Sequence, residues 1–307
     1  MNNYYDELIL SSGSVKACIF IGGLTELNKV FPLHNFKYMT GCSAGSILIT
    51  LLNIGYTLNE LKEVLLNIDF DFFQEFKLKN FFNNCGFDSG NKIENLLKAF
   101  FLNKNISVDI TFNELYIKTN MTLTLNTVNI TKGIVEYNNY INSPNMSVLL
   151  ALRMSMNIPV IYPPISYNDN LYVDGALLDP YPINYIKNTR KIGFVIYDIE
   201  EYNFMNNIGG SFINDDDNSF NYIFKMMRIL YTNYLKNKYK KNDKNSIYFH
   251  TNSFNITFKL EKDYKEKLIL YGNKKVKLYF KKKYKLQRKK YLSRKFYAIW
   301  KYNTLLK

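Results

Sequence analysis

Histidine, cysteine and proline are all scarce in this chain of 307 residues, which contains two, three and seven of them. Two histidines leave little choice of base for a serine–histidine–aspartate triad. The cysteines, Cys18, Cys42 and Cys85, lie far apart and lack the paired spacing of a metal site or a disulfide framework. We therefore expect no bound metal and a reducing compartment.

Long apolar runs are absent as well. The longest, such as Ile47–Leu52, fall far short of the roughly 20 residues that span a bilayer. No basic region precedes the first apolar run, as it would in a secretory signal. We expect a cytoplasmic protein without a transmembrane segment, and its 47% hydrophobic content excludes a disordered chain.

Acidic residues are few at the C-terminal end, and this explains the net charge of +14. Residues 259–307 hold 18 basic and 3 acidic residues, whereas the preceding 258 residues hold 22 and 23. The end of the chain interleaves Lys and Arg with Tyr, Phe and Trp300. This combination favours anionic membrane surfaces, since aromatic rings prefer the interface. Nucleic acid is the competing partner for the same residues, and a solvated terminus is the third interpretation.

Apolar stretches of strand length and helix length alternate along the chain. This alternation predicts an α/β fold with three α/β/α layers and a mostly parallel central sheet. We see no internal repeat or linker, and predict one domain over residues 6–280 followed by a basic aromatic tail over 281–307. Expected strands are 7–12, 36–41, 119–128, 133–139 and 191–199. Expected helices are 15–30, 43–55, 57–68 (with a capping box), 88–101 (also capped), 147–156, 219–240 and 263–280.

The sequence "TGCSAG" sets Ser43 in a Gly-x-Ser-x-Gly pattern between a predicted strand and a predicted buried helix. Gly41 and Gly45 lack side chains, so strand and helix can approach closely while the serine takes a strained conformation. The helix N-terminus favours negative charge beside the hydroxyl group. A purely structural turn explains the same letters equally well at this point.

A nucleophilic serine needs a base. His34 lies at the far end of the short strand, about 25–30 Å from Ser43 in an extended chain. His250 fits the order Ser…Asp…His, but only 42 residues precede Ser43, fewer than ordinary α/β-hydrolases place before their elbow. Asp174 ends an apolar strand and is followed by Gly175 and Ala176. It is a candidate base, although Asp-Gly is also an ordinary turn.

Together these segments resemble the patatin-like phospholipases, lipid acyl hydrolases with a Ser-Asp dyad and no histidine base. The likeness is carried by "LILSSGSVKACIFIGGL", "YMTGCSAGS", "TFNELYIKTNMTLTLNTVNITKG" and "ALRMSMNIPVIYPPISYNDNLYVDGALLDPYP". It is densest over residues 8–187 and weaker to about residue 280. The resemblance implies a patatin-like fold without a cofactor.

Carried over by position, Ser43 is the nucleophile and Asp174 the base. The elbow comprises Gly41, Cys42, Ala44 and Gly45, and the Asp-Gly-Ala segment continues with Gly175 and Ala176. Backbone N–H groups of the loop would stabilise the oxyanion, with Gly13 and Ser14 as its centre. That loop comprises Ser12, Gly13, Ser14, Val15, Lys16 and Ala17. Lys16 matches a basic position that could steady the loop or attract phosphate.

The loop departs from the family pattern Gly-Gly-Gly-x-Arg/Lys-Gly, because serine and alanine replace three of its glycines. Ser retains the N–H group but has poor access to positive φ, so we expect an altered or weakened oxyanion hole. A second departure is Asp179-Pro180, where family members tend to have Asn-Asn before the proline.

The main hypothesis is a calcium-independent lipid acyl hydrolase of phospholipase A type that meets phospholipid or another acyl lipid at a membrane surface. A non-catalytic lipid- or polyanion-binding protein on the same fold is the alternative, and a Ser-His esterase using His250 is the third. The Phe-rich segment Phe70–Phe82 is expected to be helical and could enter headgroups or cover the site as a lid. The acidic cluster Asp215–Asn218 could bind calcium, but solvated loops share this composition.

Overall fold

The computed structural model describes residues 5–69, 84–187, 190–198, 244–251 and 260–305, together with positions 72, 77, 79 and 232. Three predicted features lie outside these residues. They are the acidic cluster at 215–218 and, apart from isolated described positions, the helix over 219–240 and the helix and lid over 70–82.

In the part of the chain that the structure describes, eight strands form one mixed sheet in the order β5-β6-β3-β2-β1-β7-β8, with β4 paired to β3. The adjacent strands β3, β2, β1, β7 and β8 are parallel to one another. Strands β4 and β6 each pair with β3, and β5 pairs with β6, in antiparallel orientation. The predicted α/β fold is therefore confirmed, and so is the pairing of residues 133–139 with the preceding strand. The strands are β1 (Glu7–Leu10), β2 (Tyr38–Gly41), β3 (Thr122–Asn129), β4 (Ile134–Asn138), β5 (Ile165–Tyr167), β6 (Asn170–Asp174), β7 (Lys191–Asp198) and β8 (Ser246–Thr251).

The helices begin where the sequence provides capping groups. Thr57 and Glu60 form the predicted capping box of α3, and Thr111 and Glu114 form another on α6. Helix α5 begins after Gly90, which has φ 75°, and the side chains of Asp88 and Ser89 accept the N–H groups of Gly90 and Asn91. The α-helices are α1 (Cys18–Val30), α2 (Ala44–Asn53), α3 (Leu58–Asn67), α5 (Asn91–Asn103), α6 (Phe112–Thr119), α7 (Val148–Ser155) and α10 (Lys262–Leu305). Short 3₁₀ turns are η1 (Ser14–Ala17), η2 (Leu33–Asn35) and η4 (Gly175–Leu177).

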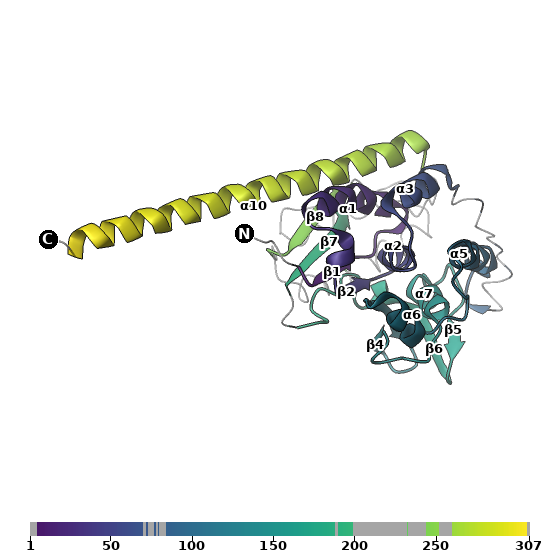
Figure 1. Ribbon diagram of the computed structural model, residues 1–307. Coiled ribbons are helices and arrows are strands. Elements are labelled where there is room, and N and C mark those ends of the chain that lie inside the picture. The colour runs from purple at the N-terminus through teal and green to yellow at the C-terminus, as the bar shows by residue number, and fades with distance from the viewer. Residues whose placement is uncertain are drawn as a thin grey trace.

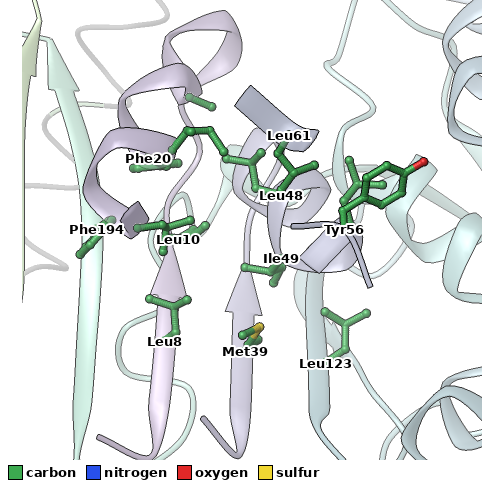
Figure 2. Packing of buried hydrophobic residues seen from close by; sticks show 14 of the residues in the cluster. Leu8, Leu10, Phe20, Met39, Leu48, Ile49, Tyr56, Leu61, Leu123 and Phe194 are labelled. Carbon is green, nitrogen blue, oxygen red and sulfur yellow. The ribbon is translucent and has the colours of Figure 1, made fainter. Parts of the chain in front are cut away.

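The main core lies between the sheet and the helices. Leu8 and Leu10 of β1 point into it beside Phe194 of β7, and Phe20, Leu48 and Leu61 approach from α1, α2 and α3 (Figure 2). Ile9 points to the opposite face, where a smaller cluster includes Tyr181 and Ile183 from the chain after η4. Both faces of β1 are thus buried, which explains the uninterrupted apolar run over residues 8–10.

Helix α10 packs on α1 and then extends well beyond the rest of the molecule (Figure 1). The two backbones approach closely at glycines. A Cβ on Gly272 would lie 2.0 Å from the carbonyl oxygen of Ile19. The helix continues without a break through position 281, so the division into a domain over 6–280 and a tail over 281–307 stays a prediction. Among the described residues, no helix has the length and apolar character needed to cross a membrane.

Candidate active site

Ser43 occupies a sharp bend between β2, which ends at Gly41, and α2, which starts at Ala44. Its backbone has φ 53° and ψ −122°, a strained conformation for a residue with a side chain. A Cβ on Gly45 would lie 2.5 Å from the carbonyl oxygen of Ser11, so glycine is needed where the helix approaches the first strand. The predicted strand–turn–helix context of the elbow is confirmed, and α2 points its N-terminus at Ser43.

The Ser43 hydroxyl donates a hydrogen bond of 2.6 Å to Oδ2 of Asp174. Strand β6 brings the carboxylate there by pairing with β3, with Asp174 opposite Thr127. The other carboxylate oxygen, Oδ1, accepts the N–H of Ala176 at 2.8 Å and lies 3.9 Å from Sγ of Cys42. Ser43 and Asp174 are 131 positions apart in the chain, yet their side chains are in direct contact and almost fully buried.

Burial controls the acidity of this pair. Loss of solvent raises the pKa of Asp174 to about 7, although hydrogen bonds from Ser43, Ala176 and Cys42 act in the opposite direction. Burial also raises the pKa of the Cys42 thiol well above its usual value, with Asp174 adding to the effect. Asp174 consequently has the proton affinity of a base that works near neutral pH, and Cys42 stays a neutral thiol.

The loop from Ser12 to Ala17 lies next to this pair, and two of its amides are already used. Ser12 donates its N–H to the carbonyl of Pro180, and Lys16 donates its N–H to the carbonyl of Gly13. These two amides are thus unsuited to bind an oxyanion. The central residues Gly13 and Ser14 are the better candidates.

The expectation that serine would avoid positive φ in this loop is wrong at Ser14, which has φ 47°. This residue is exposed, so its side chain meets little steric opposition, and the left-handed conformation costs on the order of 1 kcal/mol. Lys16 directs its ammonium group to the hydroxyl of Thr251 at 3.3 Å, which ties the loop to the end of β8. The loop therefore keeps a compact turn despite its missing glycines.

An apolar cavity adjoins Ser43. Ser14, Ser43 and Tyr162 are the three among its 19 lining residues that have polar side chains, so the cavity suits an acyl chain better than a charged group. Val15, Ala17 and Ala44 line the cavity near the elbow and the loop. Further walls come from α2 (Ile47, Leu48, Leu51), α3 (Leu61, Val64, Leu65) and α5 (Ile93, Leu96, Leu97, Phe100).

Neither histidine is placed to act on Ser43. His34 lies in η2, before β2, at the opposite end of that strand from the elbow. His250 lies on β8, three strands from β2 and hence about 14 Å across the sheet. The structure thus brings Ser43 to a carboxylate and not to an imidazole, which removes the geometric basis of a Ser-His esterase. Among the described residues, no cluster of His, Cys, Asp and Glu could hold a metal ion.

Two polar residues near the dyad were missed by the sequence analysis. Ser155 accepts the N–H of Ser43 at 3.3 Å, and the carbonyl of Asn157 accepts the N–H of Asp174 at 2.9 Å. Their only signal in the sequence is that the polar residues Ser155 and Asn157 alternate with methionines in the segment "RMSMN". That pattern does not say which residues lie opposite them.

Comparison with known proteins yields a family and viral relatives. The family model described as patatin-like phospholipase matches residues 8–186, more than half of the chain. A probable lipid hydrolase of Invertebrate iridescent virus 6 is 33% identical over 205 residues, covering 63% of this chain and 69% of the viral protein. An uncharacterized protein of Acanthamoeba polyphaga mimivirus is 28% identical over 182 residues, covering 58% of this chain and 60% of its own.

Similar solved structures support the fold. VipD from Legionella pneumophila has a TM-score of 0.64 at 14% identity, covering 91% of this chain and 67% of its own. The type III effector ExoU of Pseudomonas aeruginosa has a TM-score of 0.50 at 13% identity, covering 91% of this chain and 53% of its own. Identities this low show a shared fold and leave the chemistry to be argued from the site.

Proposed function

This chain belongs to the patatin-like phospholipase family, which supports lipid hydrolysis as its general activity, and we propose that it is a serine-dependent lipid acyl hydrolase of phospholipase A type. The observation that supports this most is the 2.6 Å hydrogen bond from the Ser43 hydroxyl to Asp174 beside an apolar cavity. In this proposal the cavity holds a fatty-acyl chain and the ester carbonyl lies over Ser43.

In the acylation step, Asp174 takes the hydroxyl proton while Oγ of Ser43 attacks the ester carbonyl carbon. The negative charge that develops on the carbonyl oxygen is stabilised by the N-terminus of α2 and the amides of Gly13 and Ser14. One such donor typically contributes about 3–4 kcal/mol to transition-state stabilisation. Collapse of this intermediate breaks the ester bond, and the departing alcohol takes the proton from Asp174. Ser43 is left as an acyl ester.

In the deacylation step, Asp174 takes a proton from water, and the resulting hydroxide attacks the acyl carbonyl carbon. The bond to Oγ breaks, the fatty acid leaves, and the proton returns to Ser43. The same carboxylate acts in both steps, so no second base is required. Its raised pKa fits this cycle, because a stronger base takes the proton more readily near neutral pH.

Covalent labelling tests this proposal directly. We expect a fluorophosphonate probe to label wild-type protein once per chain, with Ser43 as the modified residue in peptide mass spectra. Phospholipid vesicles should then release fatty acid at a rate that falls in proportion to the labelled fraction. Binding of vesicles without labelling or fatty-acid release would instead support the non-catalytic lipid-binding protein on the same fold.

We further propose that α10 docks this enzyme on anionic membranes. Its inner face packs on α1, and no acidic residue occurs between positions 267 and 288. The outer face carries cations together with two exposed leucines, Leu270 and Leu278, so attraction to anionic lipid would come mainly from its charge. Each cation contributes about 1 kcal/mol near an anionic surface. Exposed members of this face are Lys267, Leu270, Lys274, Lys277, Leu278, Lys281, Lys285 and Arg288.

The membrane proposal is tested by charge reversal. Changing Lys277, Lys281 and Lys285 to Glu should weaken binding to phosphatidylserine-containing vesicles by at least about 100-fold, because three attractions become repulsions. A matched variant reverses the exposed Lys37, Lys118 and Lys132 on the body of the molecule. Equal losses in the two triple variants, measured by vesicle co-sedimentation, would contradict a specific role for α10.

A further inference from the structure

Helix α7 contacts both halves of the proposed dyad. It packs against α2, which follows Ser43, and against β6 and η4, which hold Asp174 between them. Its last residue, Ser155, and the neighbouring Asn157 make the hydrogen bonds described above, one to each dyad residue. A single short segment thus supports the backbone of two residues that are 131 positions apart in the chain.

The hydrogen bond that Ser155 accepts supports the strained backbone of Ser43. Ser43 is buried and precedes the first turn of α2, so its N–H has no partner within that helix. Oγ of Ser155 accepts this N–H at 3.3 Å and also shares a hydrogen bond of 2.7 Å with the hydroxyl of Ser46. Removing the Ser155 hydroxyl would leave a buried donor unpaired exactly where the backbone is strained.

Asn157, whose backbone carbonyl accepts the N–H of Asp174, has its side chain held by two further hydrogen bonds. Its side-chain carbonyl accepts a hydrogen bond of 3.0 Å from the buried guanidinium of Arg153, and its amide donates to the carbonyl of Pro163 at 2.8 Å. The guanidinium in turn lies 4.8 Å from the ring centroid of Tyr162, a residue that lines the cavity. Asn157 therefore has little freedom, and neither has the Asp174 backbone that it binds.

We propose that Ser155 is a positioning residue that holds Ser43 in reach of Asp174, with Asn157 as its counterpart on the carboxylate side. The inference rests on the proposed function, since it assigns no chemistry of its own to either residue. In this proposal, residues 153–157 hold the backbones of both Ser43 and Asp174, whose side chains make the 2.6 Å hydrogen bond. The elbow and the aspartate strand then cannot shift independently.

Replacing Ser155 with alanine should lower kcat and the rate of fluorophosphonate labelling by about 10- to 100-fold, because the unpaired donor disfavours the productive conformation of Ser43. KM for a short-chain ester should stay within about twofold, since Ser155 does not line the cavity. The matched control is Ser46→Ala. It removes the same hydroxyl–hydroxyl contact from the same buried site but leaves the bond to the Ser43 amide.

Three results are informative. A large loss in Ser155→Ala with near-normal rates in Ser46→Ala, both corrected for the folded fraction, supports positioning. Equal losses in both variants would overturn it, since they would show that packing of the hydroxyl pair is what matters. Normal labelling of Ser155→Ala would overturn it as well, yet leave the proposed function intact. Failure of the proposed function has a different signature, because wild-type protein would then not label at Ser43.

Discussion

Replacing Ser43 with alanine is expected to reduce fatty-acid release from phospholipid vesicles by about 10⁴-fold or more, since the acyl group then has no oxygen to which it can be transferred. The fold should persist. Alanine loses one hydrogen bond to Asp174 and fills nearly the same space within the buried turn. Removal of the hydroxyl also takes away a contact that lowers the pKa of Asp174. The measurement is the initial rate of fatty-acid release, with circular dichroism to establish folding.

The control for this loss is Ser46→Ala, a second buried serine one helical turn further along α2. It should keep most of the activity and should label normally with fluorophosphonate. If Ser43→Ala still releases fatty acid at more than about 1% of the wild-type rate, another residue is the nucleophile and the proposed mechanism is wrong.

The elbow was predictable because its determinants are local. Gly41, Ser43 and Gly45 lie within five positions, and the strand before them and the helix after them both have clear apolar patterns. The structure confirms that strand–turn–helix arrangement. What the local pattern could not supply was a base, because Asp198 also ends an apolar strand.

Asp174 was therefore predicted from its Asp-Gly turn and then from the family resemblance. Its contact with Ser43 depends on the pairing of β6 with β3, which the sequence does not specify. Ser155 and Asn157 escaped prediction for a related reason. Each acts through a hydrogen bond to the backbone of a residue far away in the sequence. A backbone N–H group is present at almost every position and leaves no mark in the sequence.

The loop over residues 12–17 shows the limit of reasoning from residue types. Ser14 was expected to avoid positive φ, yet it adopts φ 47° because its side chain is exposed at the turn. The amides of Ser12 and Lys16 looked equivalent to those of their neighbours until the structure showed their acceptors. The Lys16 amide binds within the loop, to Gly13, whereas the Ser12 amide binds Pro180 in a distant part of the chain.

The burial of Asp174 lowers the free energy of unfolding at pH values where its carboxylate is ionised. Its pKa is raised by burial, unlike that of most carboxylates in folded proteins, so the ionised form is disfavoured by the native state. Between about pH 4 and pH 7 the native protein holds a proton on this group that the unfolded chain has lost. The free energy of unfolding therefore decreases over that interval as pH rises, by on the order of 4 kcal/mol from this residue alone.

Asp174→Asn is accordingly expected to change activity and stability in opposite directions. The amide is isosteric and can keep the bond from Ala176, but it cannot accept a proton, so kcat should fall by about 10³-fold or more. Asparagine also has no buried charge. At pH 8 the variant should need more urea to unfold than wild type, whereas at pH 5, where Asp174 is protonated, the two midpoints should nearly coincide.

The pH profile of the wild-type enzyme completes this prediction. With a short-chain ester as substrate, kcat/KM should fall tenfold per pH unit below about pH 7 and level off above it, because the active form carries ionised Asp174. A plateau that extends to pH 5 would show that the base has an ordinary carboxylate pKa, and the extra stability of Asp174→Asn at pH 8 should then vanish too. Activity and stability would in that case agree that Asp174 ionises as an ordinary carboxylate, and its role as a base tuned to neutral pH by burial would be wrong.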